Sequence, residues 1–309
     1  MTRPFTRLGK RLTRDGFIVV AVLWILGALA ALASIYAIYV VDTAVAFGVH
    51  DDRLQAEALV SAGLELTAYQ LTATPEARPT QGAFAFRLGR AAAAVEFRSE
   101  AARIDLNTAP KELLAGLFVA LGVRSDAAEV YADRIVGWRT AAPEGQDPEA
   151  SAYLTAGLRY PPRGAPFPHV GELWLVLGLP PALIERVLPF VTVYSGLQQI
   201  NVADAAPEVL AALPGMTPGQ LHTILVQRQA APQNRQALLQ LLGPAQSQAT
   251  IEGSKATRVK VRVDFDNGRR IGSEAVILIL EEGNEPYRVL SWRDESDDPP
   301  PDERPRSGR

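Results

Sequence analysis

Residues 17–41 have the sequence FIVVAVLWILGALAALASIYAIYVV, a run of 25 positions without a charged side chain. A helix of this length extends about 37 Å, which exceeds the hydrocarbon thickness of a bilayer, about 30 Å. A cleaved secretory signal has a shorter apolar region of about 7–15 residues. The run therefore predicts a membrane-spanning helix rather than a secretory signal.

The segment before this run, Met1–Gly16, is basic, with five Arg or Lys side chains against Asp15 alone. The positive-inside rule then predicts a cytoplasmic N-terminus and export of the rest of the chain. Gly16 and Phe17 lie on the boundary between the basic segment and the apolar run, as in a prepilin-type leader. We therefore predict cleavage between them, which makes Phe17 the new N-terminus. An uncleaved membrane anchor is the alternative that these residues leave open.

Composition narrows the class of protein. The chain has 309 residues, 48% of them hydrophobic, and a net charge of -3, so it has room for two or three domains and lacks the basic excess of a generic polyanion binder. It has no cysteine, which excludes disulfides, thiol catalysis and Cys-based zinc sites. It contains no Gly-x-Ser-x-Gly, P-loop or dinucleotide motif, and Ser195 has no histidine nearby in the sequence. We expect a protein that is not an enzyme.

The apolar run continues into a proline-free segment, residues 42–72. Four of its side chains follow the 3-4-3 spacing of an apolar helix face: Leu59, Ala62, Leu66 and Tyr69. A single helix over residues 17–72 would be about 80 Å long, half apolar throughout and half amphipathic. This is the shape of a pilin-type subunit, and a plain anchor followed by a juxtamembrane helix is the alternative.

Strand patterns flank a helical region. Residues 83–103 predict strands with a turn at Gly89-Arg90, and residues 257–265, 270–280 and 287–292 predict three more. Asp266-Asn267-Gly268 is a strong hairpin turn signal. Because strands lie on both sides of the helical region, we expect one antiparallel sheet that is interrupted by an inserted helical domain.

The helical region contains an internal repeat. Ile104-Asp-Leu-Asn-Thr-Ala-Pro aligns with Ile200-Asn-Val-Ala-Asp-Ala-Ala-Pro, and each copy continues into a helical hairpin. A third hairpin is predicted between them, with its first helix over residues 167–177. Residues 140–166 are rich in Pro and Gly and predict a long irregular connection.

The predicted fold is α+β: a pilin-like long N-terminal helix and an antiparallel sheet, with a large inserted all-α domain of helical hairpins. The predicted segments are a leader (1–16), the transmembrane part of the helix (17–41), its amphipathic part with the first strands (42–103), the inserted domain (104–248), the C-terminal strands (249–292) and a disordered tail (293–309).

The most specific stretches of the sequence are PRGAPFPHVGELWLVLG at 162–178 and PFVTVYSG at 189–196. With the paired repeat segments, they resemble the type II secretion system protein K family, the large minor pseudopilins of the general secretion pathway. The resemblance extends from the leader to about residue 292. It implies a pilin-like fold with a large helical insertion, cleaved after Gly16 and N-methylated at Phe17 by a prepilin peptidase.

The resemblance also implies a place in an assembly. Such a protein lies at the tip of the pseudopilus, initiates and caps its assembly for export of folded proteins across the outer membrane, and contacts the minor pseudopilins I and J, then H and the major pseudopilin. It would be a single-pass protein of the bacterial inner membrane with a periplasmic soluble domain. Ala21 stands at the fifth mature position, where most pilins carry glutamate and protein K does not.

Some members of the family bind calcium through acidic side chains of the helical domain. This sequence departs from that pattern, because residues 138–142 contain no carboxylate. The weak candidates that remain nearby are Asp133, Glu144, Asp147 and Glu149. Solvated loop acids are the favoured interpretation, and we expect that no cofactor is required.

Nucleic-acid binding is the strongest rival function, because the Leu213-Pro-Gly-Met216 turn resembles that of a helix-hairpin-helix module. Residues 104–245 contain nine Arg or Lys against twelve Asp or Glu, whereas phosphate binding needs several cations on one face. Only Arg228 and Arg235 lie near the second hairpin. We therefore expect no nucleic-acid partner.

Overall fold

The computed structural model describes residues 14–73, 78–142, 148–283 and 285–295, with residues 14–17, 41–51 and 295 described by their backbone only. The chain divides into two compact units, Met1–Ala58 and Leu59–Arg309. Most of the predicted leader and of the predicted tail lies outside the described residues.

In the first unit the chain is helical from Arg14, where the long helix α1 (Arg14–Thr72) begins. The part from Ile18 to Val40 has a mean hydropathy of 2.7 over 23 residues, and none of it is buried. By length and composition this part can cross a membrane, which confirms the predicted N-terminal apolar helix.

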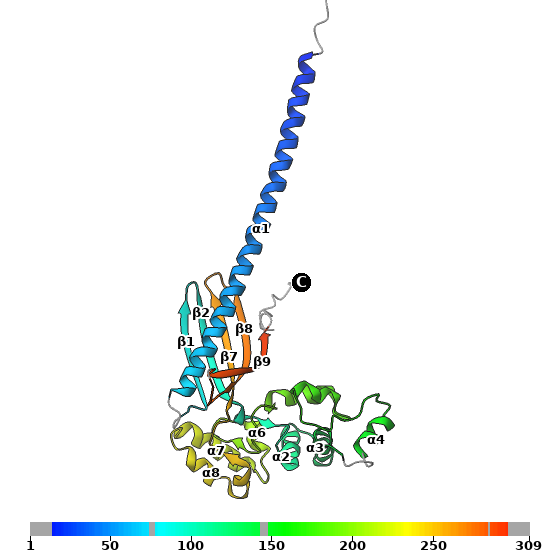
Figure 1. The fold of residues 1–309 in the computed structure, drawn as a ribbon, viewed down its shortest axis with the longest axis vertical. Helices are drawn as coiled ribbons and strands as arrows, with labels where there is room; N and C mark the ends of the chain where they lie inside the picture. The colour runs from blue at the N-terminus through cyan, green and yellow to red at the C-terminus, as the bar shows by residue number, and fades with distance from the viewer. Residues whose placement is uncertain (1–13, 74–77, 143–147, 284, 296–309) are drawn as a thin grey trace, which may run out of the picture. The chain divides into compact units, whose positions relative to one another are not determined.

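The second unit is built on a five-stranded antiparallel sheet (Figure 1). Its spatial order is β1-β2-β7-β8-β9. The strands are β1 (Gln81–Leu88), β2 (Ala91–Ser99), β7 (Ala256–Phe265), β8 (Arg270–Ile279) and β9 (Tyr287–Glu295). The predicted turns at Gly89 and Gly268 are present, and both glycines have a positive φ, which other residues rarely adopt.

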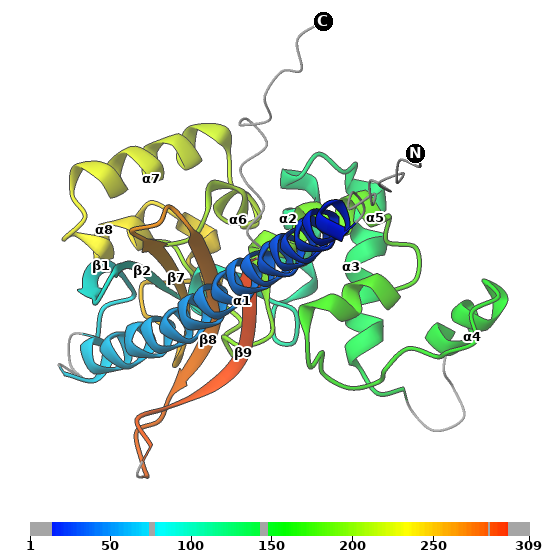
Figure 2. The ribbon, with the colours of Figure 1, turned by 90° about the horizontal axis from the view of Figure 1, so that it is seen from above.

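Residues 59–72 of α1 cover one face of this sheet (Figure 2). The contact is close, because a Cβ added at Gly63 would lie 3.1 Å from Val95 and 3.2 Å from Val261. Along β7 every second side chain points to this buried face, and charged side chains alternate with them. The apolar core of the sheet therefore follows the alternation that the sequence shows.

The helical insert leaves the sheet at the end of β2 and returns to it at β7, the neighbouring strand. The α-helices of the insert are α2 (Lys111–Ala120), α3 (Ser125–Arg139), α4 (Pro148–Thr155), α5 (Pro181–Val187), α6 (Pro207–Ala211), α7 (Pro218–Ala230) and α8 (Arg235–Gln240). Its short 3-10 helices are η2 (Glu100–Ala102), η3 (Val170–Leu175), η4 (Leu188–Phe190) and η5 (Gly243–Gln248). The predicted α+β class is thus confirmed.

Two short parallel ladders organise the insert. Strand β3 (Ile104–Asp105) pairs with β4 (Val191–Thr192), and β5 (Ile200–Asn201) pairs with β6 (Ala249–Thr250). Each repeat copy therefore begins with a two-residue strand that pairs with a strand far downstream. One hydrophobic core joins both copies, from Ile104 to Ala249.

Two segment predictions within the insert are wrong. The connection over 140–166 is not irregular throughout, because α4 forms within it and buries Tyr153, whose hydroxyl accepts a hydrogen bond from the Leu177 amide (2.8 Å). The predicted helix over 167–177 is only η3. Pro168 disfavours helical backbone before it, and the His169 side chain caps the helix by accepting from the Gly171 amide (2.9 Å).

Candidate functional site

The predicted processing residues Gly16 and Phe17 lie in the first turns of α1, and their side chains are outside the described residues. Ala21 lies in the apolar part of the same helix. Cleavage, N-methylation and the role of Ala21 remain predictions.

The predicted calcium ligands do not come together in the described part of the insert. Asp133 in α3 pairs with Lys111 (2.7 Å), and Glu149 in α4 pairs with Arg134 (2.8 Å). Glu144 and Asp147 lie outside the described residues. No group of three or more metal-ligating His, Cys, Asp or Glu side chains occurs among the residues that are described. Asp133 and Glu149 each have a cationic partner, and calcium binding by the four candidates remains a prediction.

A buried polar cluster joins the sheet to the insert. Glu100, in η2, is fully buried, and its two carboxylate oxygens accept hydrogen bonds from Arg258 on β7 at 2.8 and 3.0 Å. The hydroxyl of Thr192, on β4, also donates to Glu100. Arg258 reaches Glu274 on β8 as well. We call these four residues the Glu100 cluster.

Within the Glu100 cluster the charged forms of Glu274 and Arg258 are favoured. Burial acts to raise the pKa of Glu274, but Arg258 and Lys260 outweigh it and the pKa is lowered. Burial likewise acts to lower the pKa of Arg258, and the hydrogen bonds from Arg258 to Glu100 and Glu274 raise it. Removing one partner of such a pair leaves a buried charge uncompensated, which costs about 3–5 kcal/mol. The cluster therefore fixes the start of the insert to the sheet.

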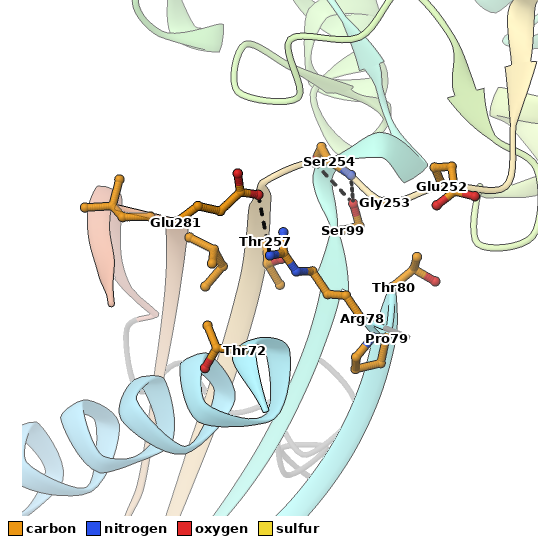
Figure 3. Close-up of a pocket in the computed structure, with 12 residues that line it drawn as sticks. Thr72, Arg78, Pro79, Thr80, Ser99, Glu252, Gly253, Ser254, Thr257 and Glu281 are labelled. Atoms are coloured by element: carbon orange, nitrogen blue, oxygen red, sulfur yellow. Dashed lines mark hydrogen bonds and ion pairs between the residues drawn. The ribbon is translucent and has the colours of Figure 1, made fainter. Parts of the chain in front are cut away.

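A polar pocket of about 600 Å³ lies beside the two crossings between sheet and insert (Figure 3). Ser99, at the end of β2, accepts a hydrogen bond from the amide of Ser254, just before β7 (2.8 Å). On the opposite side, Arg78 donates to the Leu71 carbonyl (3.1 Å) and lies 3.7 Å from Glu281. None of the twelve lining residues is His, Cys or Asp, and the hydroxyl of Ser99 and the carboxylate of Glu281 are engaged in the contacts just described. Its hydrogen bonds hold the crossings together.

In each repeat copy, an arginine side chain donates hydrogen bonds to two backbone carbonyls near the start of the copy. Arg139, at the end of α3, donates to the carbonyls of Leu106 and Ala109, the latter at 2.7 Å. Arg228, near the end of α7, donates to the carbonyls of Val202 and Ala205, the latter at 2.8 Å. Burial lowers the pKa of both guanidinium groups, and a nearby aspartate partly offsets the effect in each.

These contacts bear on the nucleic-acid alternative, which is not supported. Arg228 is committed to backbone carbonyls inside the insert. Arg235 donates to the Thr80 hydroxyl (2.7 Å) and lies 3.5 Å from the buried carboxylate of Asp204. The two cations near the second hairpin are therefore engaged with the protein itself rather than held ready for phosphates.

Sequence reasoning missed the Glu100 cluster and both arginine contacts. The members of the Glu100 cluster come from η2, β4, β7 and β8, and a single sequence does not show which of many charged residues meet. The only available signal was that Arg258 and Lys260 alternate with buried valines, which places both on one face of a strand.

Comparison with known proteins gives a consistent result. Residues 93–196 match the family model for the type II secretion system (T2SS), protein K. The type II secretion system protein K of Pseudomonas aeruginosa is 34% identical over 112 residues, which are 35% of this chain and 33% of that protein. The aligned segment thus spans about a third of the relative's length.

A solved structure extends the likeness to most of the chain. It is a chain in the crystal structure of the GspK-GspI-GspJ complex from the type 2 secretion system of enterotoxigenic Escherichia coli. The match has a TM-score of 0.56 at 18% sequence identity and covers 80% of this chain and 98% of the other. At this identity the match shows a common fold. Residues 93–196 are thus similar in sequence to the type II secretion system protein K family, and the fold of the chain is similar to that of the solved structure.

Proposed function

We propose that this chain is a minor pseudopilin at the tip of the type II secretion pseudopilus, where it initiates assembly and caps it for export of folded proteins across the outer membrane. The observation that carries the proposal is the combination of an apolar N-terminal helix with a pilin-like sheet whose neighbouring strands β2 and β7 are separated by an insert of about 150 residues.

The insert supports the capping role because it is fixed to the sheet. Glu100, at its start, is held by Arg258 and Thr192, and the Ser99–Ser254 contact closes its base. A bulky insert held in this way occupies space beside the sheet that a further subunit of ordinary pilin size would need. Growth beyond this subunit is therefore blocked, which suits a terminal position.

Ala21 supports the same position. In a pilin assembly the glutamate at the fifth mature position pairs with the N-terminal amine of a neighbour, whereas an alanine cannot neutralise a buried ammonium group. A subunit that lacks this carboxylate is poorly suited to an internal place and is tolerated at an end. Cleavage after Gly16 would make Phe17 the first residue and Ala21 the fifth.

The partners follow from the same reasoning. The solved structure of similar fold comes from a complex of GspK with GspI and GspJ, and we propose that pseudopilins I and J bind this chain directly, followed by H and the major pseudopilin. We place the apolar helix in the bacterial inner membrane, with a cytoplasmic N-terminus and with Leu59–Arg309 in the periplasm. The prepilin peptidase is the proposed processing enzyme.

Copurification tests the assembly. The full chain, produced in detergent together with pseudopilins I and J of the same bacterium, is expected to elute with both as one complex. The major pseudopilin in place of I and J serves as the control and is expected to associate more weakly. Failure to associate with I and J, both with calcium and with a chelator, would contradict the tip role.

Processing is tested separately. Gly16→Ala is expected to slow cleavage, because the peptidase needs close approach to the backbone at that residue, and the precursor should accumulate on a gel. Gly27→Ala is the matched control, since a Cβ at Gly27 meets nothing within 4 Å. Equal processing of the two variants would contradict the leader assignment.

A further inference from the structure

The sheet face opposite residues 59–72 of α1 is basic. The alternation of β2 and β7 places Arg98, Arg258, Lys260 and Arg262 on this open face, where Arg98 pairs in register with Arg258. Arg103, just after η2, joins them at the rim of a recess described below. We call these five residues the basic face. It stands out because the whole chain has a net charge of -3.

Part of this charge is neutralised within the protein. Arg258 pairs with Glu100 and Glu274, and Lys260 lies 3.3 Å from Glu274. In the described part of the chain, by contrast, the guanidinium groups of Arg98, Arg103 and Arg262 make no hydrogen bond and no ion pair. The basic face therefore keeps an excess of positive charge after its internal pairs are counted.

A recess of about 640 Å³ lies within the basic face. It is lined by Arg98, Arg103, Arg258 and Lys260, by Glu96, and by Phe97 with the first residues of β1. Arg103 is half-buried here beside two other guanidinium groups. Burial, and then the charge of Arg258, lower the pKa of Arg103, and Glu100 offsets this only in part. An added anion would relieve the electrostatic cost at Arg103.

The geometry favours carboxylates over polyanions. Planar guanidinium groups bind carboxylates through paired hydrogen bonds, and two such groups without internal partners line one recess. The excess charge is small, and Glu96 lies among the cations. A duplex or an anionic bilayer needs many cations over a wide area, whereas one or two acidic side chains need only this recess.

We propose that the basic face is a docking surface for an acidic surface of a partner protein, with a carboxylate side chain bound in the recess beside Arg98 and Arg103. The proposal does not depend on the place of the chain in a pseudopilus. Binding of an acidic peptide tests it without any other pseudopilin, so its failure and the failure of the tip role are distinguishable.

The test uses the full chain in a non-ionic detergent and a fluorescein-labelled polyglutamate peptide, followed by fluorescence anisotropy at low and high salt. The double variant Arg98→Gln/Arg103→Gln is expected to weaken binding by about tenfold or more, because two charge-assisted contacts are lost. The matched control is Arg124→Gln, an arginine of the insert whose side chain is 84% exposed. It is expected to leave binding unchanged.

A second variant is needed because Arg103 is half-buried and its substitution in the double variant could disturb folding. Arg98→Glu reverses a charge on an exposed strand position, and circular dichroism confirms whether each variant is folded. Equal binding of polyglutamate by the folded Arg98→Glu variant and the unchanged chain would overturn the proposal. Tighter, Arg98-dependent binding of duplex DNA or of phosphatidylglycerol vesicles than of polyglutamate would also overturn it, since the face would then recognise phosphates.

Discussion

The two copies of the internal repeat have the same backbone contacts but different side chains at their most buried polar position. In copy one the amide of Leu106 donates to the carbonyl of Thr192 (2.8 Å), and in copy two the amide of Val202 donates to that of Thr250 (2.9 Å). In both copies an arginine binds the carbonyls two and five residues after the first isoleucine. The repeat is therefore a structural unit as well as a sequence pattern.

The difference lies at Asp105 and Asn201, which occupy equivalent places and are both buried. Asp105 accepts hydrogen bonds from the Ser195 hydroxyl (3.0 Å) and the Gly196 amide (2.8 Å). Asn201 instead donates its side-chain amide to the carbonyl of Ile251 (3.2 Å) and also to that of Glu252. In each copy one side-chain oxygen accepts from the backbone amide two residues later, that of Asn107 (2.8 Å) or Ala203 (2.9 Å). The second side-chain atom meets donors in copy one and acceptors in copy two, so each copy requires its own residue.

The two copies also meet directly at α2 and α6. A Cβ added at Gly116 would overlap the carbonyl group of Ala212, so the helices approach as closely as glycine permits. Because both copies contribute to one hydrophobic core, a substitution in one copy also affects the packing of the other. Exchanging side chains between the copies tests whether each buried site requires its own residue.

The largest expected effect comes from Asn201→Asp. A carboxylate here faces two carbonyl oxygens in a buried site, and we expect the free energy of unfolding to fall by about 3–5 kcal/mol at neutral pH. The loss should shrink as the pH is lowered, because the site raises the pKa of the new carboxyl group and protonation restores a donor. Chemical unfolding of the full chain, followed by circular dichroism, measures it. Asn234→Asp, at the exposed N-cap of α8, is the control that should stay within about 0.5 kcal/mol.

The reverse exchange, Asp105→Asn, is expected to lower the free energy of unfolding by about 2–3 kcal/mol. One oxygen remains to accept from the Asn107 amide, but the new NH₂ group meets the donors of Ser195 and Gly196. The same unfolding experiment checks it, with the exposed Asp126→Asn of α3 as the control. If Asp105→Asn has the same free energy of unfolding as the unchanged chain, the claim that the donors in copy one require a carboxylate is contradicted.

Arg139→Met and Arg228→Met test what the copies share. Each change keeps much of the apolar stem and leaves two carbonyls without their donor, so each should cost about 1–3 kcal/mol. Because the two contacts are equivalent, we expect the two losses to agree within about 1 kcal/mol. A large loss for one variant and none for the other, measured by thermal unfolding, would show that the copies are not equivalent in energy.

The smallest expected effect is a change in the pH dependence of stability, and it concerns Glu274 of the sheet rather than the repeat. The pKa of Glu274 is lowered in the folded chain, so its contribution to stability is present above the pKa of the unfolded state and is lost as the pH falls through the lower, folded value. Stability measured between neutral pH and about pH 3 should therefore decline less in Glu274→Gln than in the unchanged chain. An identical decline would show that Glu274 is not held by Arg258 and Lys260.

Much of the fold could be predicted from periodicity, but the predicted apolar face of residues 42–72 was wrong in part. Leu66 and Tyr69 are exposed, because the helix turns Gly63 and its neighbours toward the sheet. The apolar run before residue 42, the alternation in β7 and the turn at Gly268 each depend on neighbouring residues, and each appears where expected. The helix α4 was missed because its proline-rich surroundings are typical of a loop, whereas the burial of Tyr153 stabilises a helix there. The family resemblance also came from local motifs, and residues 93–196 confirm it.

The sequence by itself determined the apolar helix, the strands, the repeat and the family resemblance, because each depends on contiguous residues. The tertiary structure alone decided which charges meet. Arg139 and Arg228 make equivalent contacts 35 and 28 positions after Ile104 and Ile200, so no fixed spacing reveals them. The Glu100 cluster and the basic face likewise combine residues that are brought together only when β2 pairs with β7 across the insert. Pairing between distant segments sets the local donors, acceptors and charges, and a single sequence does not contain that information locally.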